Sequence, residues 1–321
     1  MIFIRFAVLI QRDGMTLLLV LLCNFFLAST ISSNKVLLSM FPAILFVGIR
    51  MLCAEILICV YAYCFSTRMR WRYIKHDIGI LVGVSLFTTY LPSILKAFSL
   101  KHLFSSKAAF YGSIDPFITA LYAYFLWHEK LSWKQFVGII IGFSGIVIMT
   151  LGQTPPEQGW HAWFILFYPE LASFASVVVS RWGWILLRAL VRNERYTPLE
   201  VNGMSMVGSG ILALITATML NQWKDVSIPS VSTFLCLFVY TVIIGNVTGY
   251  MLYAYVIKHV NLTFVSLAGF SIPIFVGLIG WLLLAEPMSY SILLAGLFVF
   301  LGLLIFYYDE LCQVAGARSG R

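Results

Sequence analysis

Apolar stretches of about 20 residues alternate with short polar or turn-forming segments along the chain. A helix of that length rises about 1.5 Å per residue and spans a hydrocarbon layer about 30 Å thick. Ten stretches fit, and they predict ten transmembrane helices at roughly 15–34, 42–65, 77–98, 103–126, 132–151, 162–187, 200–220, 232–256, 261–285 and 288–308. The pattern therefore predicts an all-α integral membrane protein.

A pattern of glycine, proline and glutamate occurs twice, 157 residues apart and with the same internal spacing. The two copies are Gly112, Pro116, Glu129 and Gly269, Pro273, Glu286. Glycine-containing apolar helices follow each copy. A doubled unit of membrane length indicates two homologous halves. We expect a first five-helix repeat at 1–152 and a second at 153–321, within one membrane domain.

The distribution of lysine and arginine predicts the orientation, because cytoplasmic loops are enriched in both. With the N-terminus inside, the cytoplasmic segments hold 14 of the 21 basic residues, and three lie within spans. The opposite side holds four, namely Lys35, Lys96, Lys101 and Lys224. Both termini are therefore expected in the cytoplasm. Five spans per half then make the second half enter from the opposite face, which is a 5+5 inverted-topology repeat.

Both repeated prolines fall near the middle of their spans, about 12 or 13 residues from one end. Proline removes one backbone hydrogen bond and crowds the carbonyl four residues earlier. Those carbonyls belong to Gly112 and Gly269, so Gly112, Pro116, Gly269 and Pro273 are candidate hinges. The alternative is a static kink that only shapes packing. Glu129 and Glu286, at the ends of spans 4 and 9, are expected to cap the N-terminus of the next helix or to pair with a loop base; a gating or coupling role is the alternative.

Ionisable residues inside spans 2, 4 and 6 are the candidates for substrate binding, because each is costly in hydrocarbon unless it faces a cavity or a partner. These candidates, with the tyrosine on the same face of span 4, are Arg50, Glu55, Lys107, Tyr111, Asp115, Glu170 and Arg181. Internal pairing that fixes helix register, for example Asp115 with Arg50, is the alternative. A cavity with both charge signs suits a small polar or zwitterionic solute.

Spacing limits which of these charges pair within one helix. Lys107 and Asp115 are eight residues apart on one face of span 4, or about 12 Å along the axis. Glu170 and Arg181, eleven residues apart, return to nearly one face of span 6 at about 16 Å. Neither separation permits a salt bridge within the helix, so each residue needs a partner across the bundle or in a substrate.

Composition excludes several classes of protein. Hydrophobic residues make up 61% of the chain and charged residues 11%, whereas soluble domains are about one quarter charged. The net charge of +8 is explained by cytoplasmic loops, so no nucleic-acid partner is expected. The six cysteines and five histidines form no metal-binding pattern, and no nucleotide or hydrolase motif occurs. We expect no enzyme activity, no cofactor and no metal.

At this point the chain resembles the drug/metabolite transporter superfamily, specifically its EamA-like ten-span members. The resemblance is strongest between Ser105 and Met149, through the segments 113–121, 128–132 and 138–146, and a looser copy runs from Val265 to Phe306. Arg50 and the pair Asn34-Lys35 also match. Departures are Cys23-Asn24, where many members have tryptophan, the charged pair in span 6, and the lysines Lys96 and Lys107.

The resemblance implies a cavity among spans 1–4 and 6–9, with spans 5 and 10 peripheral, and alternating access without ATP. It implies a monomer or homodimer in a bacterial inner membrane. Family substrates include amino acids, amines, nucleotide-linked sugars and S-adenosylmethionine exchanged for its spent product. We expect a secondary active transporter of an amino-acid-like or S-adenosylmethionine-like metabolite. The alternatives are a channel or lipid scramblase, and a non-transporting membrane scaffold.

Overall fold

The computed structural model describes residues 14–64, 74–151, 160–192, 196, 198–249, 252, 256, 262–287 and 290–312. Both chain termini and several loops that carry the predicted cytoplasmic charges lie outside these ranges. The described part contains helices at all ten predicted positions and no strand. The sequence prediction of an all-α fold is confirmed.

Six of the ten predicted spans are continuous helices in the described residues, and four are divided. The continuous ones are α2 (Gly14–Met40), α3 (Ala43–Cys64), α8 (Trp133–Leu151), α9 (Trp160–Arg192), α10 (Pro198–Met219) and α15 (Tyr290–Phe306). The divided ones are α4 (Ile74–Val84) with η2 (Ser85–Tyr90) and α5 (Leu91–His102), α6 (Ser105–Gly112) with α7 (Asp115–Trp127), α11 (Val231–Tyr240) with η4 (Thr241–Gly249), and α13 (Leu262–Gly269) with α14 (Ser271–Leu284).

The divisions fall at equivalent places in the two halves. Span 4 is divided between α6 and α7, and span 9 between α13 and α14, in each case just before the repeated proline. Spans 3 and 8 each contain a π-helical segment, η2 and η4, whose first residues are 156 positions apart. The sequence pattern did not predict these π segments.

Five helical stretches in the described residues are individually long and apolar enough to cross a membrane: Leu18–Met40, Asp77–His102, Trp133–Thr150, Phe167–Arg188 and Phe264–Leu284. Shorter apolar helices lie at Gly203–Met219, Val231–Asn246 and Tyr290–Phe306. Many large apolar side chains face outward, among them Leu283, Trp133 and Leu18. An outer surface of this kind is stable against lipid and not against water.

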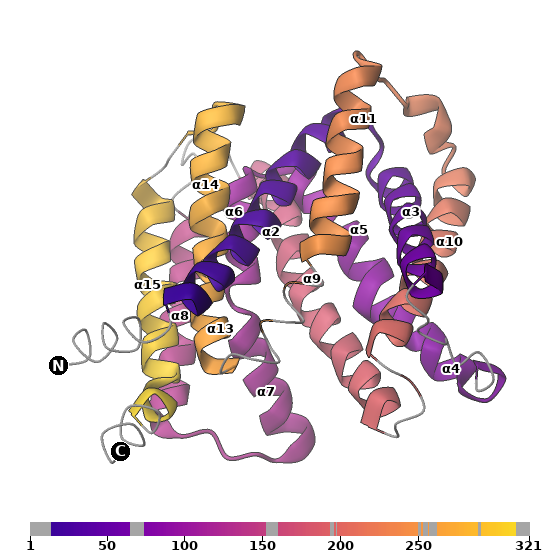
Figure 1. The fold of residues 1–321 in the computed structure, drawn as a ribbon. Helices are drawn as coiled ribbons and strands as arrows, with labels where there is room; N and C mark the ends of the chain where they lie inside the picture. Colours follow the sequence, from indigo (N-terminus) through magenta and orange to yellow (C-terminus); the bar gives the residue numbers. More distant parts are fainter. Residues whose placement is uncertain are drawn as a thin grey trace.

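The helices pack with the symmetry expected of two related halves (Figure 1). Two pairs of equivalent helices pack against each other, α8 with α15 along one edge and α3 with α10 along the other, and α6 packs against α14 between them. Other contacts come in matched sets, since α4 and η2 pack on α9 as α11 and η4 pack on α2, and α14 packs on α2 as α7 packs on α9. The chain is therefore a repeated helical membrane fold.

Glycines bring α8 and α15 into direct backbone contact. A Cβ added at Gly138 would lie 2.6 Å from the Gly302 carbonyl oxygen, and one at Gly302 would lie 2.7 Å from the Gly138 carbonyl oxygen. One at Gly142 would lie 2.0 Å from the ring of Phe117. Small residues of this kind allow close approach where no hydrophobic effect drives helices together in lipid. The last helices of both repeats thus form one tight pair at the edge of the bundle.

Candidate functional site

A cavity of about 460 Å³ lies between the two repeats, and we call it the central cavity. Its lining comes from α2, α3, η2, α5, α6 and α7 of the first repeat and from α9, η4, α13 and α14 of the second. None of the described lining residues belongs to α8 or α15, which agrees with the peripheral place implied for spans 5 and 10. The described residues of α10 also contribute none, unlike the implied span 7, because α10 packs behind α3.

The ends of both divided helices lie on the wall of the central cavity. Gly112, Pro116, Gly269 and Pro273 all line it. A Cβ added at Gly112 or Gly269 would meet nothing within 4 Å, so neither glycine is required for close packing. The helix breaks fall before the prolines rather than at them. Ser113 and Phe270 donate their backbone N–H groups to the third residue before them, which replaces α-helical bonds by tighter turns.

Spans 4 and 6 are connected by two ion pairs of opposite polarity. Lys107 pairs with Glu170, and Asp115 pairs with Arg181 with 2.7 Å between Oδ1 and Nε. The two charged positions on each helix therefore find their partners across the bundle. Asp115 does not pair with Arg50, the example considered from the sequence.

The Asp115–Arg181 pair lies in the central cavity. Both side chains line it, and they remain 34% and 26% exposed. The Arg181 guanidinium also lies over the ring of Trp184, with 5.6 Å between Cζ and the ring centroid. The Nε atom makes no hydrogen bond of acceptable geometry, so the contact with Asp115 is ionic. A partly exposed pair of this kind is accessible to a solute that carries charges of its own.

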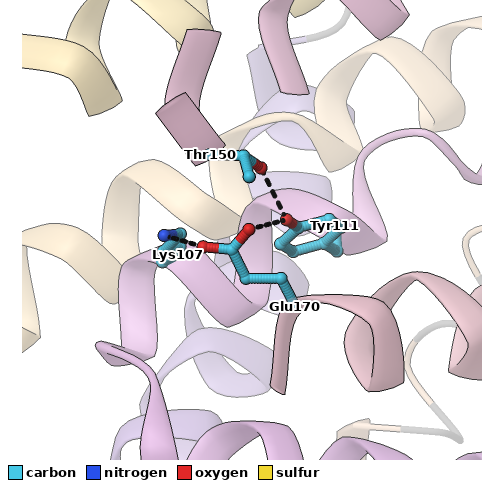
Figure 2. Close-up of polar contacts among 4 residues, drawn as sticks. All are labelled: Lys107, Tyr111, Thr150 and Glu170. Atoms are coloured by element: carbon cyan, nitrogen blue, oxygen red, sulfur yellow. Dashed lines mark hydrogen bonds and ion pairs between the residues drawn. The ribbon is translucent and has the colours of Figure 1, made fainter. Parts of the chain in front are cut away.

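The Lys107–Glu170 pair belongs to a different, closed cluster (Figure 2). Both side chains are buried, with 5% and 7% exposed. Tyr111 donates its hydroxyl hydrogen bond to Glu170 Oε2 at 3.3 Å and lies 3.0 Å from the hydroxyl of Thr150. Lys107, Tyr111 and Glu170 are absent from the lining of the central cavity. Their charges satisfy one another, and their geometry favours a structural cluster.

Of the remaining candidates, Arg50 lines the central cavity and Glu55 does not. The Arg50 guanidinium lies 5.5 Å from the ring centroid of Phe46. Glu55 is buried against α10, where a Cβ added at Gly203 would lie 2.7 Å from Glu55 Oε1. Glu55 thus lies between the paired helices α3 and α10, away from the cavity.

Two cavity residues were missed from the sequence. Lys96 was counted with the loop charges, but it lies within α5 and lines the central cavity. The departure at Asn24 is also explained. Its amide donates to the Ala268 carbonyl at 2.8 Å and to the Ser271 hydroxyl at 3.0 Å, across the break between α13 and α14.

Asn24 and Arg181 occupy equivalent positions, 157 residues apart. Asn24 on α2 holds the start of α14, and Arg181 on α9 holds the start of α7 through Asp115. Each repeat therefore secures the divided helix of one half with a polar side chain. The contact is neutral in one half and ionic in the other, and the equivalent of Asp115 is Ile272. Repeat spacing was the signal in the sequence that relates these residues.

One end of the bundle is closed by contacts between helix ends. Glu286 accepts the Ser105 backbone N–H with Oε1 at 3.0 Å and Oε2 at 2.9 Å, and Oε2 also accepts the Ser105 hydroxyl at 2.6 Å. Lys35 donates to the carbonyls of Leu100 at 2.7 Å and Leu103 at 2.5 Å. Glu286 thus caps α6, a helix of the other repeat. The sequence suggested that Glu286 caps the next helix in the chain, whereas the helix it caps is α6.

A second cavity, of about 520 Å³, lies at this closed end, and we call it the end recess. Lys35, Lys107, Glu170 and Glu286 line it. The described residues lining the end recess and the central cavity have no member in common. The contacts of Lys35 and Glu286 that close this end therefore border the end recess and not the central cavity. The same is true of the Lys107–Glu170 pair.

Glu129, the equivalent of Glu286, makes no such contact. Both glutamates follow a residue with left-handed backbone, His128 at φ 54° and Ala285 at φ 52°. Both backbone N–H groups bond to the carbonyl six residues earlier, Ala123 in one half and Gly280 in the other. The Glu129 side chain is nevertheless exposed, whereas Glu286 is buried. The two repeats share the backbone of this motif and differ in the partner of the carboxylate.

Known proteins resemble this chain over most of its length. The model of the EamA-like transporter family matches residues 14–151 and 168–308. A protein of Chlamydia muridarum named "S-adenosylmethionine/S-adenosylhomocysteine transporter" is 29% identical, over 98% of each chain. One of Chlamydia trachomatis serovar L2 with the same name is also 29% identical, over 93% of this chain and 91% of the other.

More distant similarity gives the same fold. Protein PecM of Dickeya dadantii is 25% identical over 66% of this chain and 68% of its own. A crystal structure titled only as that of a protein superposes with a TM-score of 0.62 at 16% identity, over 91% of this chain and 94% of the other. Two matches of one family model, each to a five-span half, account for the repeat seen in the sequence and in the helix packing. The chain therefore belongs to the EamA-like transporter family and is a multi-pass membrane transporter.

Proposed function

We propose that the protein is a secondary carrier that exchanges a small zwitterionic metabolite, of the S-adenosylmethionine and S-adenosylhomocysteine class, by alternating access. The observation that carries this proposal is the central cavity, where both divided helices meet a partly exposed ion pair. Its volume of about 460 Å³ lies within the roughly 300–1,000 Å³ range of small-molecule sites. The names of the relatives that span the whole chain support this class of cargo.

The cargo has features that match the lining of the cavity. Its amino and sulfonium cations require a carboxylate, and Asp115 supplies one at the start of α7. Its purine requires a flat apolar surface, and the rings of Phe46 and Phe270 line the same cavity. We propose Asp115 as the binding group for the cationic part of the cargo, with Arg181 as the internal counter-charge that the cargo displaces.

The difference between the two glutamates supports the proposal of alternating access. In the described state Glu286 caps α6, whereas Glu129 is exposed. Leu262 begins α13 at the position that Ser105 holds in α6, 157 residues earlier. We propose that in the opposite state Glu129 caps the N-terminus of α13 and Glu286 is released. The glycine–proline positions of α6–α7 and α13–α14 act as the hinges of this exchange.

The proposed orientation places both termini in the cytoplasm of a bacterium and the Glu286 end on the outer side of its inner membrane. The described state is then closed to the outside. The direction of the lysine and arginine bias supports this placement.

Counterflow in proteoliposomes tests the function. Vesicles are loaded with unlabelled S-adenosylhomocysteine, diluted, and given labelled S-adenosylmethionine outside; the panel also includes amino acids and nucleosides. We expect saturable uptake that requires the internal solute and no ATP. Uptake that rises linearly with concentration and ignores the internal solute indicates a channel, and absence of uptake for every solute contradicts the carrier.

A further inference from the structure

One cation on the wall of the central cavity lacks a partner among the described residues. The charged lining residues, within the described part of the chain, are Arg50, Lys96, Asp115 and Arg181. Asp115 pairs with Arg181, and the Arg50 guanidinium contacts the Phe46 ring. Lys96 remains, and a lone ammonium group inside a membrane is costly without a counter-anion.

Lys96 lies among the other charged groups of the central cavity. Its side chain is exposed to the cavity, and among the described residues it forms no salt bridge or hydrogen bond. It lies close enough to Arg50 for electrostatic repulsion, and close enough to Asp115 for attraction. Lys35, in contrast, uses its ammonium to bind three backbone carbonyls at the closed end. The sequence alone gives no reason to separate these two lysines.

Neutral polar residues line the central cavity together with Lys96. Ser93, one turn earlier on α5, lines the cavity too, and so does Asn34 on α2. An ammonium ion, a guanidinium and neutral donors on neighbouring helices form a site for an anionic group of a few atoms. Asp115 is the carboxylate of the same cavity. The lining of one cavity therefore offers cations at Lys96 and Arg50 and a carboxylate at Asp115.

We infer that Lys96, together with Arg50, forms a carboxylate subsite that binds the α-carboxylate of the cargo. This inference rests on the proposed function and adds a requirement to it: the cargo must carry a carboxylate in addition to its cationic group. Amines and other cations that lack the carboxylate are then poor ligands, even where the rest of the molecule is unchanged.

The test compares pairs of ligands that differ only in the carboxylate. In counterflow with labelled S-adenosylmethionine, unlabelled S-adenosylmethionine and its decarboxylated form serve as competitors. One charge-assisted contact is worth about a 10- to 100-fold difference in affinity. We expect the carboxylated competitor to be favoured by at least about 10-fold in the original protein. In the Lys96→Met variant the preference should fall below about threefold, with little change for the decarboxylated ligand.

Lys101→Met is the matched control, because Lys101 lies on the same helix, is exposed and is absent from the central cavity. It should keep the preference. Equal competition by both ligands in the original protein, or an unchanged preference in Lys96→Met, overturns the subsite and leaves the carrier intact.

A second measurement tests the subsite without relying on transport. It therefore remains informative if no solute is exchanged and the proposed carrier function fails. Lys96→Cys is treated with an anionic and a cationic methanethiosulfonate of similar size, and the original protein, which has its own cysteines, is the blank. Arg50 and Arg181 remain in the cavity, so the anionic reagent should react at least about fivefold faster. Equal rates, or a faster cationic reagent, reject an anion site at this position.

Discussion

Glu286 in the second repeat caps Ser105 in the first, with both carboxylate oxygens accepting the backbone N–H and one accepting the hydroxyl. The contact joins the end of α14 to the start of α6 and closes one end of the bundle. Its equivalent in the other half, Glu129, has the same backbone and an exposed carboxylate. Because the two sites share a backbone conformation and differ in this contact, each glutamate is expected to stabilise a different state.

Glu286→Gln should weaken this closure, since an amide caps a helix N-terminus less well than a carboxylate. A cap is worth about 0.5–2 kcal/mol, which shifts the equilibrium between states about 2- to 30-fold. The readout is the rate at which Cys at position 93, in place of the cavity-lining Ser93, reacts with a thiol reagent added from the Glu286 side. Glu129→Gln should change the rate in the opposite sense. Equal rates in both variants remove the glutamates from gating.

Lys107→Met should destabilise the fold, because it leaves the buried carboxylate of Glu170 without its partner. Breaking a buried pair costs about 3–5 kcal/mol, whereas replacing both charges is often neutral. We therefore expect the double variant Lys107→Met/Glu170→Met to recover most of the loss in thermal unfolding in detergent. Lys134→Met is the control, since its pair with Asp309 is about half exposed, and its midpoint should not change. A double variant as unstable as the single one contradicts the interpretation.

Asp115→Asn should reduce counterflow at least about 10-fold while folded protein remains in the membrane. The carboxylate is one third exposed in the cavity, so its loss removes a cargo contact more than a packing contact. Asp309→Asn, which removes a carboxylate from an ion pair outside the cavity, should transport normally. Normal counterflow by Asp115→Asn excludes that residue from the binding site.

Gly112→Ala and Gly269→Ala should fold normally, because a Cβ at either position meets open space. Each should slow exchange about fivefold, since alanine restricts the backbone by about 1 kcal/mol at the helix break. Gly142→Ala is the contrasting variant: its Cβ would lie 2.0 Å from the Phe117 ring, and it should lose about 1–3 kcal/mol of stability. Transport at the original rate in both of the first two variants leaves the breaks as static kinks.

The repeat spacing in the sequence predicts more than the number of helices. It relates Glu129 to Glu286 and Pro116 to Pro273, and the left-handed caps at His128 and Ala285 follow the same relation. Helical spacing also places Lys107 and Asp115 on one face, as it does Glu170 and Arg181. Spacing within a helix carries no information about the neighbouring helix, so the sequence left their partners open.

Lys96 shows the limit of reading charge from sequence alone. A lysine near the end of an apolar stretch is equally compatible with a loop, a helix end that reaches the membrane surface, or a cavity. Its place in the central cavity depends on which face of α5 turns inward, and that is set by the packing of α5 on α9 and on η2.

The sequence by itself determined the membrane fold and the two repeats and indicated a disturbed helix near each repeated proline, because hydrophobic length, internal repetition and proline can be read along the chain. The tertiary structure decided which charges neutralise one another, which remain in the central cavity, and which glutamate closes the bundle. These depend on distances between helices remote in the sequence. The physical reason is that a charge in a membrane is stabilised by its partner, and only packing brings the partner near.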